Sequence, residues 1–226
     1  MRYHQAITPE LITLSPRVPP RGSVVWLHGL GADGSDFVPL VEELSLPETC
    51  PLRFLFPNAP TRPITINNGY AMPAWYDIRS FGGDDDDDAG IRASETTVRA
   101  LLQREIDGGI AAGKIVLAGF SQGGAVALHT GARYITPLAG VLALSTYLPL
   151  PQLLATEAQP PSKATPILMC HGTHDDIVPL QAGERSCAFL RQLGYDVTWK
   201  TYDMQHEVAL EEVEDIREWL LRRMSG

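Results

Sequence analysis

Ser121 lies in a sequence pattern that can make a serine a nucleophile. Residues 119–123, GFSQG, match G-x-S-x-G, in which the glycines let a serine stand on a strained turn between a strand and a helix. An apolar run precedes Gly119 and a helical pattern follows Gln122, so the pattern has the strand–turn–helix context that it requires. A tight turn with an idle serine has the same composition, so the two interpretations depend on the partners available elsewhere.

His206 is the histidine that best fits the role of a base for this serine. A serine hydroxyl needs a base, usually a histidine oriented by a carboxylate, and with this turn the chain order is serine, acid, histidine. His206 lies in YDMQHEV, between a predicted strand and the last predicted helix. The other histidines precede the serine, lie down the helix after it, or flank the candidate acid: His4, His28, His129, His171 and His174.

Two aspartates compete for the role of the acid. The segment HGTHDDIVP, 171–179, follows a predicted strand and supplies Asp175 and Asp176. Composition does not separate them, because either carboxylate could orient a histidine while the other caps the next helix.

A nucleophilic serine also needs two backbone N–H groups to stabilise the oxyanion. The amide of Gln122 directly follows the serine, and Leu30 is the best-placed second donor, in the glycine-rich loop 28–37. Such a loop can instead bind phosphate. However, G-x-x-x-x-G-K-[ST] is absent and the spacing of G-x-G-x-x-G is not met.

Strand-like and helical segments alternate along the chain, and the stretch between Pro57 and Ala89, rich in Pro, Asn and Gly, reads as a loop. The alternation predicts one α/β domain over 1–226, with a mostly parallel sheet, helices on both faces and no separate cap domain. Ligands bind at the carboxyl ends of such strands. The predicted strands are 23–29, 52–57, 114–120, 138–145, 166–172 and 196–202; the predicted helices are 35–44, 89–109, 122–134, 181–193 and 209–224.

Composition excludes several classes of protein. The chain has 226 residues, 44% of them hydrophobic, and a net charge of −9, which argues against nucleic acid or anionic membranes as partners. We see no signal peptide and no apolar run long enough to span a membrane. The three widely spaced cysteines predict reduced thiols and a cytoplasmic location. The acidic run Asp84–Asp88 is interpreted as a solvated loop.

Taken together, these segments resemble the phospholipase/carboxylesterase family of α/β-hydrolases, which holds small bacterial carboxylesterases and the acyl-protein thioesterases. The resemblance covers nearly the whole chain, and several segments are more similar to the bacterial carboxylesterases. Its most specific segment is FPNAPTRPITINNGYAMPAWYDI, 56–78. The other matching segments are 26–37, 119–128, 144–149, 171–179 and 202–208.

The resemblance implies a serine esterase for short- to medium-chain carboxylic esters, without a metal or organic cofactor. Its nucleophile, acid and base fall on Ser121, Asp175 and His206, and its oxyanion donors on the amides of Leu30 and Gln122. Without a cap domain the acyl chain must lie in a groove between loops, with candidate walls at Met72, Trp75, Tyr147 and Leu148. The family also implies that two copies can form a homodimer.

Three other functions stay open at this point. An acyl-protein thioesterase and a lysophospholipase would use the same triad, so the sequence does not separate them from an esterase. A non-catalytic small-molecule receptor on the same fold is less favoured, because such receptors need an enclosing lid and no cap domain is expected here.

Overall fold

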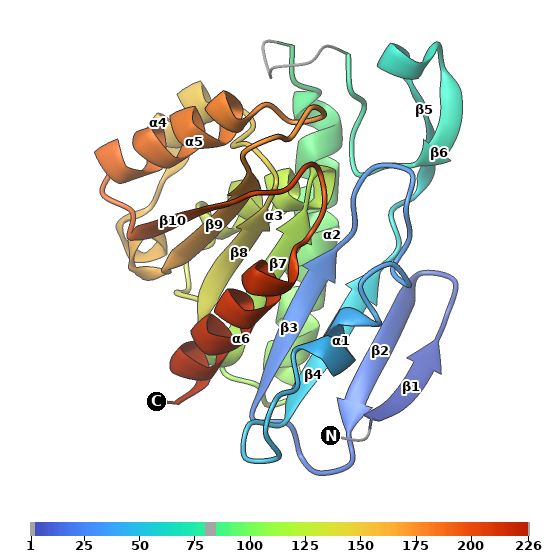
Figure 1. Cartoon of the computed structure of the whole chain (residues 1–226), viewed down its shortest axis with the longest axis vertical. Helices are drawn as coiled ribbons and strands as arrows, with labels where there is room; N and C mark the ends of the chain where they lie inside the picture. The colour runs from blue at the N-terminus through green and yellow to red at the C-terminus, as the bar shows by residue number, and fades with distance from the viewer. Residues whose placement is uncertain (1–2, 80–84, 226) are drawn as a thin grey trace.

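A mostly parallel sheet runs through the centre of the protein (Figure 1). The computed structural model describes residues 3–79 and 85–225. Within them, the order of the 8-stranded sheet is β1-β2-β4-β3-β7-β8-β9-β10. The segment from β4 to β10 is parallel, which confirms the predicted fold class. Its strands are β3 (Gly22–Leu27), β4 (Leu52–Pro57), β7 (Ile115–Phe120), β8 (Gly140–Leu144), β9 (Ile167–Gly172) and β10 (Val197–Tyr202).

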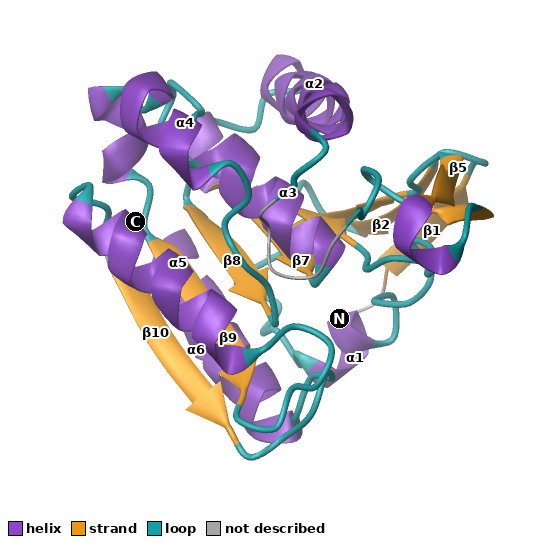
Figure 2. Cartoon of the chain, turned by 90° about the horizontal axis from the view of Figure 1, so that it is seen from above, coloured by secondary structure: helices purple, strands orange, loops and turns teal. Residues whose placement is uncertain are grey.

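Helices cover both faces of this sheet. One core lies between the sheet and α2 (Asp88–Asp107), α3 (Gln122–Gly131), α4 (Pro151–Glu157) and α5 (Leu180–Gln192). Figure 2 shows α2, α3 and α4 gathered along one side. The second core lies under α1 (Leu40–Glu43) and α6 (Leu210–Met224). No helix within 3–79 or 85–225 is long and apolar enough to cross a membrane.

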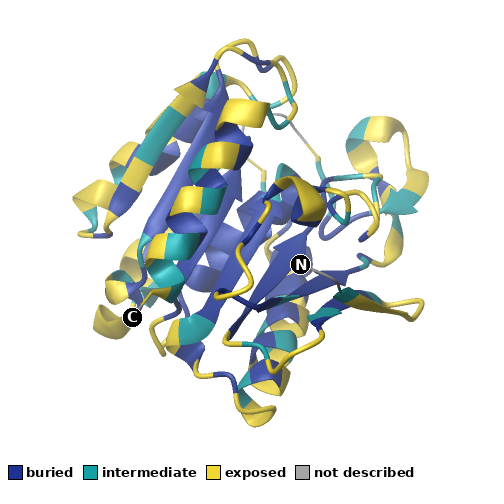
Figure 3. Ribbon diagram, turned by 60° about the horizontal axis from the view of Figure 1, so that its bottom comes forward, coloured by how far each residue is buried: buried dark blue, intermediate teal, exposed yellow. Residues whose placement is uncertain are grey.

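Burial on both faces explains why the parallel strands are apolar along most of their length. In β3, Val25 and Leu27 belong to the core under α2 and α3, whereas Val24 and Trp26 belong to the core under α6. Successive side chains of a strand point to opposite faces, so a strand covered on both faces has no polar alternation. Figure 3 shows the buried sheet between outer elements with exposed surfaces.

Several short elements differ from the prediction. β1 (Tyr3–Ile7) and β2 (Leu11–Pro16) extend one edge of the sheet in antiparallel pairing. A hairpin of β5 (Thr61–Ile64) and β6 (Tyr70–Pro73) occupies part of the expected loop. These four segments lie at an edge of the sheet or outside it and are partly exposed, so they lack the apolar runs of the central strands. Helix α4 was also not predicted, and α1 is shorter than the predicted helix at 35–44.

The interpretation of the acidic run Asp84–Asp88 as a solvated loop is wrong for Asp86 and Asp87, whereas Asp85 and Asp88 are exposed. Asp84 lies outside the described residues. Asp87 is buried and accepts hydrogen bonds from two backbone amides, one of them in the first turn of α2. Asp86 accepts a hydrogen bond from the backbone amide of Leu150, at 2.8 Å. Each of these two carboxylates therefore accepts hydrogen bonds from the backbone of other segments.

Glu212 places an acidic side chain in the core beneath α6. The residue is 0% exposed, and burial raises the pKa of its carboxyl from 4.5 to about 8. Because the pKa is higher in the folded state, folding favours the protonated form. This contribution to stability is complete below the pKa of the unfolded side chain and is lost as the pH rises through about 8.

We predict that Glu212→Gln leaves the free energy of unfolding nearly unchanged at pH 5 and raises it at pH 9. The increase should be on the order of 1 kcal/mol for each unit by which burial raises the pKa. Urea titrations at the two pH values measure this difference. Glu211→Gln, at an exposed position of the same helix, is the control and should show no such pH dependence. Equal effects of Glu212→Gln at both pH values would contradict the prediction.

Candidate active site

Ser121 stands on a strained backbone between β7 and α3. Its φ is 53° and its ψ is −121°, a combination that residues other than glycine rarely adopt. The amide of Ser121 donates to the carbonyl of Leu144 at 2.8 Å, and the hydroxyl of Thr146 donates to the carbonyl of Ser121 at 2.7 Å. Hydrogen bonds from the neighbouring strand end therefore hold the turn in place.

The glycines on either side of Ser121 are required by close backbone contacts. A Cβ atom on Gly119 would lie 2.3 Å from the carbonyl oxygen of Gly123, and one on Gly123 would lie 2.4 Å from the carbonyl oxygen of Leu27. Any side chain at these two positions would separate β7, α3 and β3. The pattern G-x-S-x-G is thus a packing requirement of this turn.

A buried carboxylate orients His206. Oδ2 of Asp175 lies 2.8 Å from Nδ1 of His206, and the Asp175 side chain is 0% exposed. Oδ1 of Asp175 accepts hydrogen bonds from the amides of Ile177 and Val178 at 3.0 and 2.8 Å. Asp176 is exposed. The structure therefore pairs Asp175, and not Asp176, with the histidine.

His206 lies at the same edge of the sheet as Ser121. Its ring packs against that of Phe120, the residue before Ser121, with 4.7 Å between the ring centroids. Ser121 follows β7, Asp175 follows β9 and His206 follows β10. Because these strands are parallel, their carboxyl ends bring the three side chains to one edge. With Nδ1 of His206 bound to Asp175, Nε2 is the nitrogen left for a reactant.

Two histidines excluded as bases on sequence grounds have structural partners. His171 is buried beneath the loop that carries Asp175: its Nε2 lies 2.8 Å from the carbonyl of Val178, and burial lowers its pKa. His129 is buried within α3, and its Nε2 lies 3.0 Å from the carboxylate of Glu95. Both support the scaffold around the candidate site.

His28 shapes the loop that carries Leu30. Nδ1 of His28 lies 2.7 Å from the carbonyl of Gly29, and Nε2 accepts a hydrogen bond from the amide of Ala59 at 3.0 Å. Burial lowers the pKa of His28, which favours the neutral ring that these two bonds require. Among the residues described, neither the amide of Leu30 nor that of Gln122 makes a hydrogen bond within the protein, so both remain available to a ligand.

The side chain of Gln122 holds a segment that is remote in the sequence. Its Oε1 accepts a hydrogen bond from the amide of Trp75, and its Nε2 donates to the carbonyl of Tyr76, both at 2.8 Å. The indole Nε1 of Trp75 in turn donates to the carbonyl of His28. The sequence drew attention only to the backbone of Gln122, because partners more than 40 residues away leave no local pattern.

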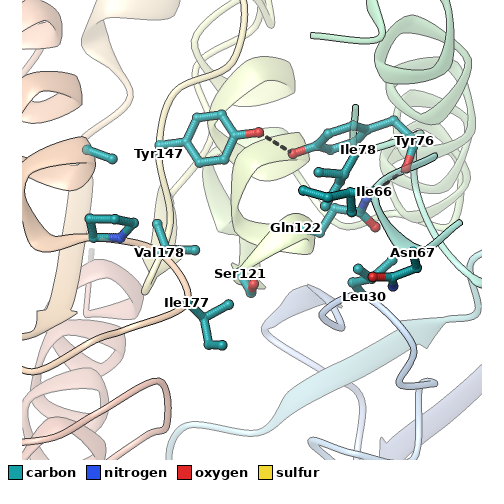
Figure 4. Close-up of a pocket in the computed structure, with 12 residues that line it drawn as sticks. Leu30, Ile66, Asn67, Tyr76, Ile78, Ser121, Gln122, Tyr147, Ile177 and Val178 are labelled. Carbon is teal, nitrogen blue, oxygen red and sulfur yellow. Dashed lines mark hydrogen bonds between the residues drawn. The ribbon is translucent and has the colours of Figure 1, made fainter. Parts of the chain in front are cut away.

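An apolar pocket of about 210 Å³ opens beside Ser121 (Figure 4). Its walls come from the loop after β3, the turn after β5, the segment after β6, the loop after β8 and the loop before α5. Most of the lining side chains are aliphatic or aromatic. The lining residues are Leu30, Ile66, Asn67, Tyr76, Ile78, Ser121, Gln122, Tyr147, Ile177, Val178, Pro179 and Ala182.

Of the four wall residues expected from the resemblance, Tyr147 lines this pocket. Trp75 and Leu148 are not among the lining residues; their side chains belong to the core under α2 and α3, at 1% and 4% exposed. Met72 is also not among the lining residues; its Sδ lies 3.7 Å from Nδ2 of Asn67, next to the pocket. Apolar residue types alone do not show which side chains face the cavity.

Comparisons with known proteins agree with this architecture. A family model described as Phospholipase/Carboxylesterase matches residues 9–223. Acyl-protein thioesterase 1 of Gibberella zeae is 39% identical over 212 residues, which cover 89% of this chain and 90% of that protein. A probable carboxylesterase of Oryza sativa subsp. japonica is 34% identical over 210 residues, 91% of this chain and 79% of that protein.

The crystal structure of Arabidopsis thaliana SOBER1 superposes with a TM-score of 0.86 at 32% identity, covering 90% of this chain and 99% of that one. The family model spans nearly the whole chain, and relatives above 30% identity cover most of it. The chain therefore belongs to the phospholipase/carboxylesterase family of ester hydrolases.

Proposed function

We propose that the protein is a serine hydrolase that cleaves short- to medium-chain carboxylic esters through an acyl-enzyme. The observation that carries the proposal is the buried Asp175 carboxylate bound to Nδ1 of His206, at the sheet edge where Ser121 stands on its strained turn. This order of nucleophile, acid and base is that of a serine triad.

In the acylation step, Nε2 of His206 removes the hydroxyl proton of Ser121 while Oγ attacks the carbonyl carbon of the ester. The negative charge develops on the carbonyl oxygen, where the amides of Leu30 and Gln122 donate hydrogen bonds. The position of Gln122 at the first turn of α3 adds the positive end of the helix dipole. His206 then gives its proton to the departing alcohol as the tetrahedral intermediate collapses.

In the deacylation step, His206 removes a proton from water, which attacks the acyl group on Ser121. The same two amides hold the second oxyanion, and His206 returns the proton to Oγ of Ser121. Throughout, Asp175 keeps His206 in the tautomer with a proton on Nδ1 and stabilises the imidazolium. These steps need only the side chains and the two backbone amides named, with neither a metal nor an organic cofactor.

The pocket supports a small neutral acyl group as the preferred substrate. Its volume of about 210 Å³ is below the roughly 300–1,000 Å³ that is usual for ligand pockets. Its lining is largely aliphatic and aromatic, which favours an alkyl chain over a charged group. Short- to medium-chain esters therefore fit the site better than long-chain lipids.

A second candidate function is that of an acyl-protein thioesterase. The observation that favours it is the relative at 39% identity that carries that name. A thioester reacts through the same steps, because the leaving group is then a thiol. Rates on short p-nitrophenyl esters, long-chain esters, a lysophospholipid and an S-palmitoyl peptide, measured side by side, separate these activities.

We predict that Asp175→Asn lowers kcat for p-nitrophenyl butyrate by roughly 10³- to 10⁴-fold, because the histidine loses its orienting carboxylate. Asp176→Asn is the matched control: this neighbour is exposed, and its variant should keep wild-type kcat. If the two variants lost activity equally, the assignment of Asp175 would be wrong.

We predict that a fluorophosphonate labels the folded protein at Ser121 and that Ser121→Ala abolishes both labelling and hydrolysis. Mass spectrometry of the adduct identifies the modified residue. Absence of labelling in the folded wild-type protein would rule out the hydrolase mechanism.

We predict that kcat/KM rises between about pH 6 and 8, because a histidine base must be neutral to accept the proton of the serine. A pH-rate profile with p-nitrophenyl acetate, corrected for spontaneous hydrolysis, measures this rise. A flat profile across that range would contradict a histidine base.

A further inference from the structure

Two tyrosine hydroxyls meet at the pocket, above Ser121 in the view of Figure 4. The hydroxyl oxygens of Tyr76 and Tyr147 lie 3.0 Å apart. Tyr76 comes from the segment after β6 and Tyr147 from the loop after β8. Their contact therefore joins two walls of the pocket that are far apart in the sequence.

Asp86 places a negative charge near this pair of hydroxyls. Burial first, and then the charge of the Asp86 carboxylate, raise the pKa of Tyr147 to about 12. Burial and the same carboxylate also raise the pKa of Tyr76. Both phenols therefore stay protonated and neutral at physiological pH.

Asp86 also fixes the backbone that carries Tyr147. It accepts a hydrogen bond from the amide of Leu150 at 2.8 Å, where the chain takes a left-handed conformation, φ 50° and ψ 49°, before α4. The carboxylate therefore fixes the last residue of the segment 147–150.

The opposite wall is fixed from the nucleophile turn. The carbonyl of Tyr76 accepts a hydrogen bond from the side chain of Gln122 at 2.8 Å, and Tyr76 is 1% exposed. Of the two walls, the one with Tyr76 is therefore tied to the catalytic edge, and the one with Tyr147 is tied to Asp86 at the start of α2.

We propose that Asp86, by fixing the segment 147–150 that carries Tyr147, is a positioning residue that closes the acyl end of the pocket. The closed wall limits the length of the acyl chain, and the carboxylate behind it disfavours acyl groups that end in a negative charge. This inference rests on the proposed function, in which the pocket holds the acyl group of the substrate. The rest of the lining is mostly aliphatic and aromatic, so neutral alkyl chains are preferred.

Three variants separate the parts of this arrangement. Tyr147→Phe keeps the ring and removes its hydrogen bond to Tyr76, whereas Asp86→Ala removes the acceptor of the Leu150 amide. Asp86→Asn keeps an acceptor for the Leu150 amide but removes the charge. The matched control is Asp85→Asn, whose carboxylate is 65% exposed and pairs with Arg79 at 3.5 Å.

The measurement is kcat/KM on p-nitrophenyl esters from two to sixteen carbons and on a p-nitrophenyl monoester of a dicarboxylic acid. In Tyr147→Phe and Asp86→Ala, the ratio of the rate on long chains to that on butyrate should rise about tenfold, the effect expected for one methylene in an apolar pocket. Asp86→Asn should keep the wild-type chain-length profile and gain activity on the anionic ester. Asp85→Asn should match wild type on every substrate.

An unchanged chain-length profile in folded Tyr147→Phe and Asp86→Ala would overturn the inference, as would a profile in Asp86→Asn like that of Asp86→Ala. Circular dichroism shows whether each variant is folded, and Tyr147→Phe alone decides the matter if Asp86→Ala does not fold. Failure of the proposed function is a different result: wild type would not hydrolyse any ester, or Ser121→Ala would remain active.

Discussion

The close crossing of β7, α3 and β3 at Ser121 is the constraint on which the site depends. Only hydrogen atoms fit at Gly119 and Gly123, because their neighbours are backbone atoms of adjacent elements. The close contact of these elements places Ser121 at the N-terminus of α3, where the serine itself has a positive φ. A left-handed serine costs energy, and the packing of the sheet around it supplies the restraint that keeps it there.

The parallel sheet brings together residues that follow different strands in the sequence. Since β7, β9 and β10 run in the same direction, the residues that follow them emerge at one edge. The Asp175 carboxylate is buried and receives two backbone hydrogen bonds as well as the histidine. A buried charge needs such partners, so the loop that carries Asp175 and the position of His206 depend on each other.

The pocket is built from side chains that do two tasks. The side chain of Gln122, the residue after Ser121, lines the pocket and also bonds the backbone of Trp75 and Tyr76. Asp86 belongs to a run interpreted from the sequence as solvated charge, and its carboxylate instead holds the backbone of Leu150. Hydrogen bonds between distant segments therefore assemble the loops around the pocket.

The sequence by itself determined the central fold and the order of the candidate triad. Apolar strands, intervening helices and the G-x-S-x-G turn are local patterns, and local patterns reflect backbone geometry. The weaker edge strands and the hairpin β5–β6 were missed, because partly exposed strands leave no apolar run. Only the tertiary structure showed that Asp175, and not Asp176, contacts His206. It also placed Trp75 and Leu148 in the core. The partners of Asp86 and of the Gln122 side chain were likewise visible only in the structure. Those distinctions depend on which groups meet across tens of residues, and no local pattern encodes such contacts.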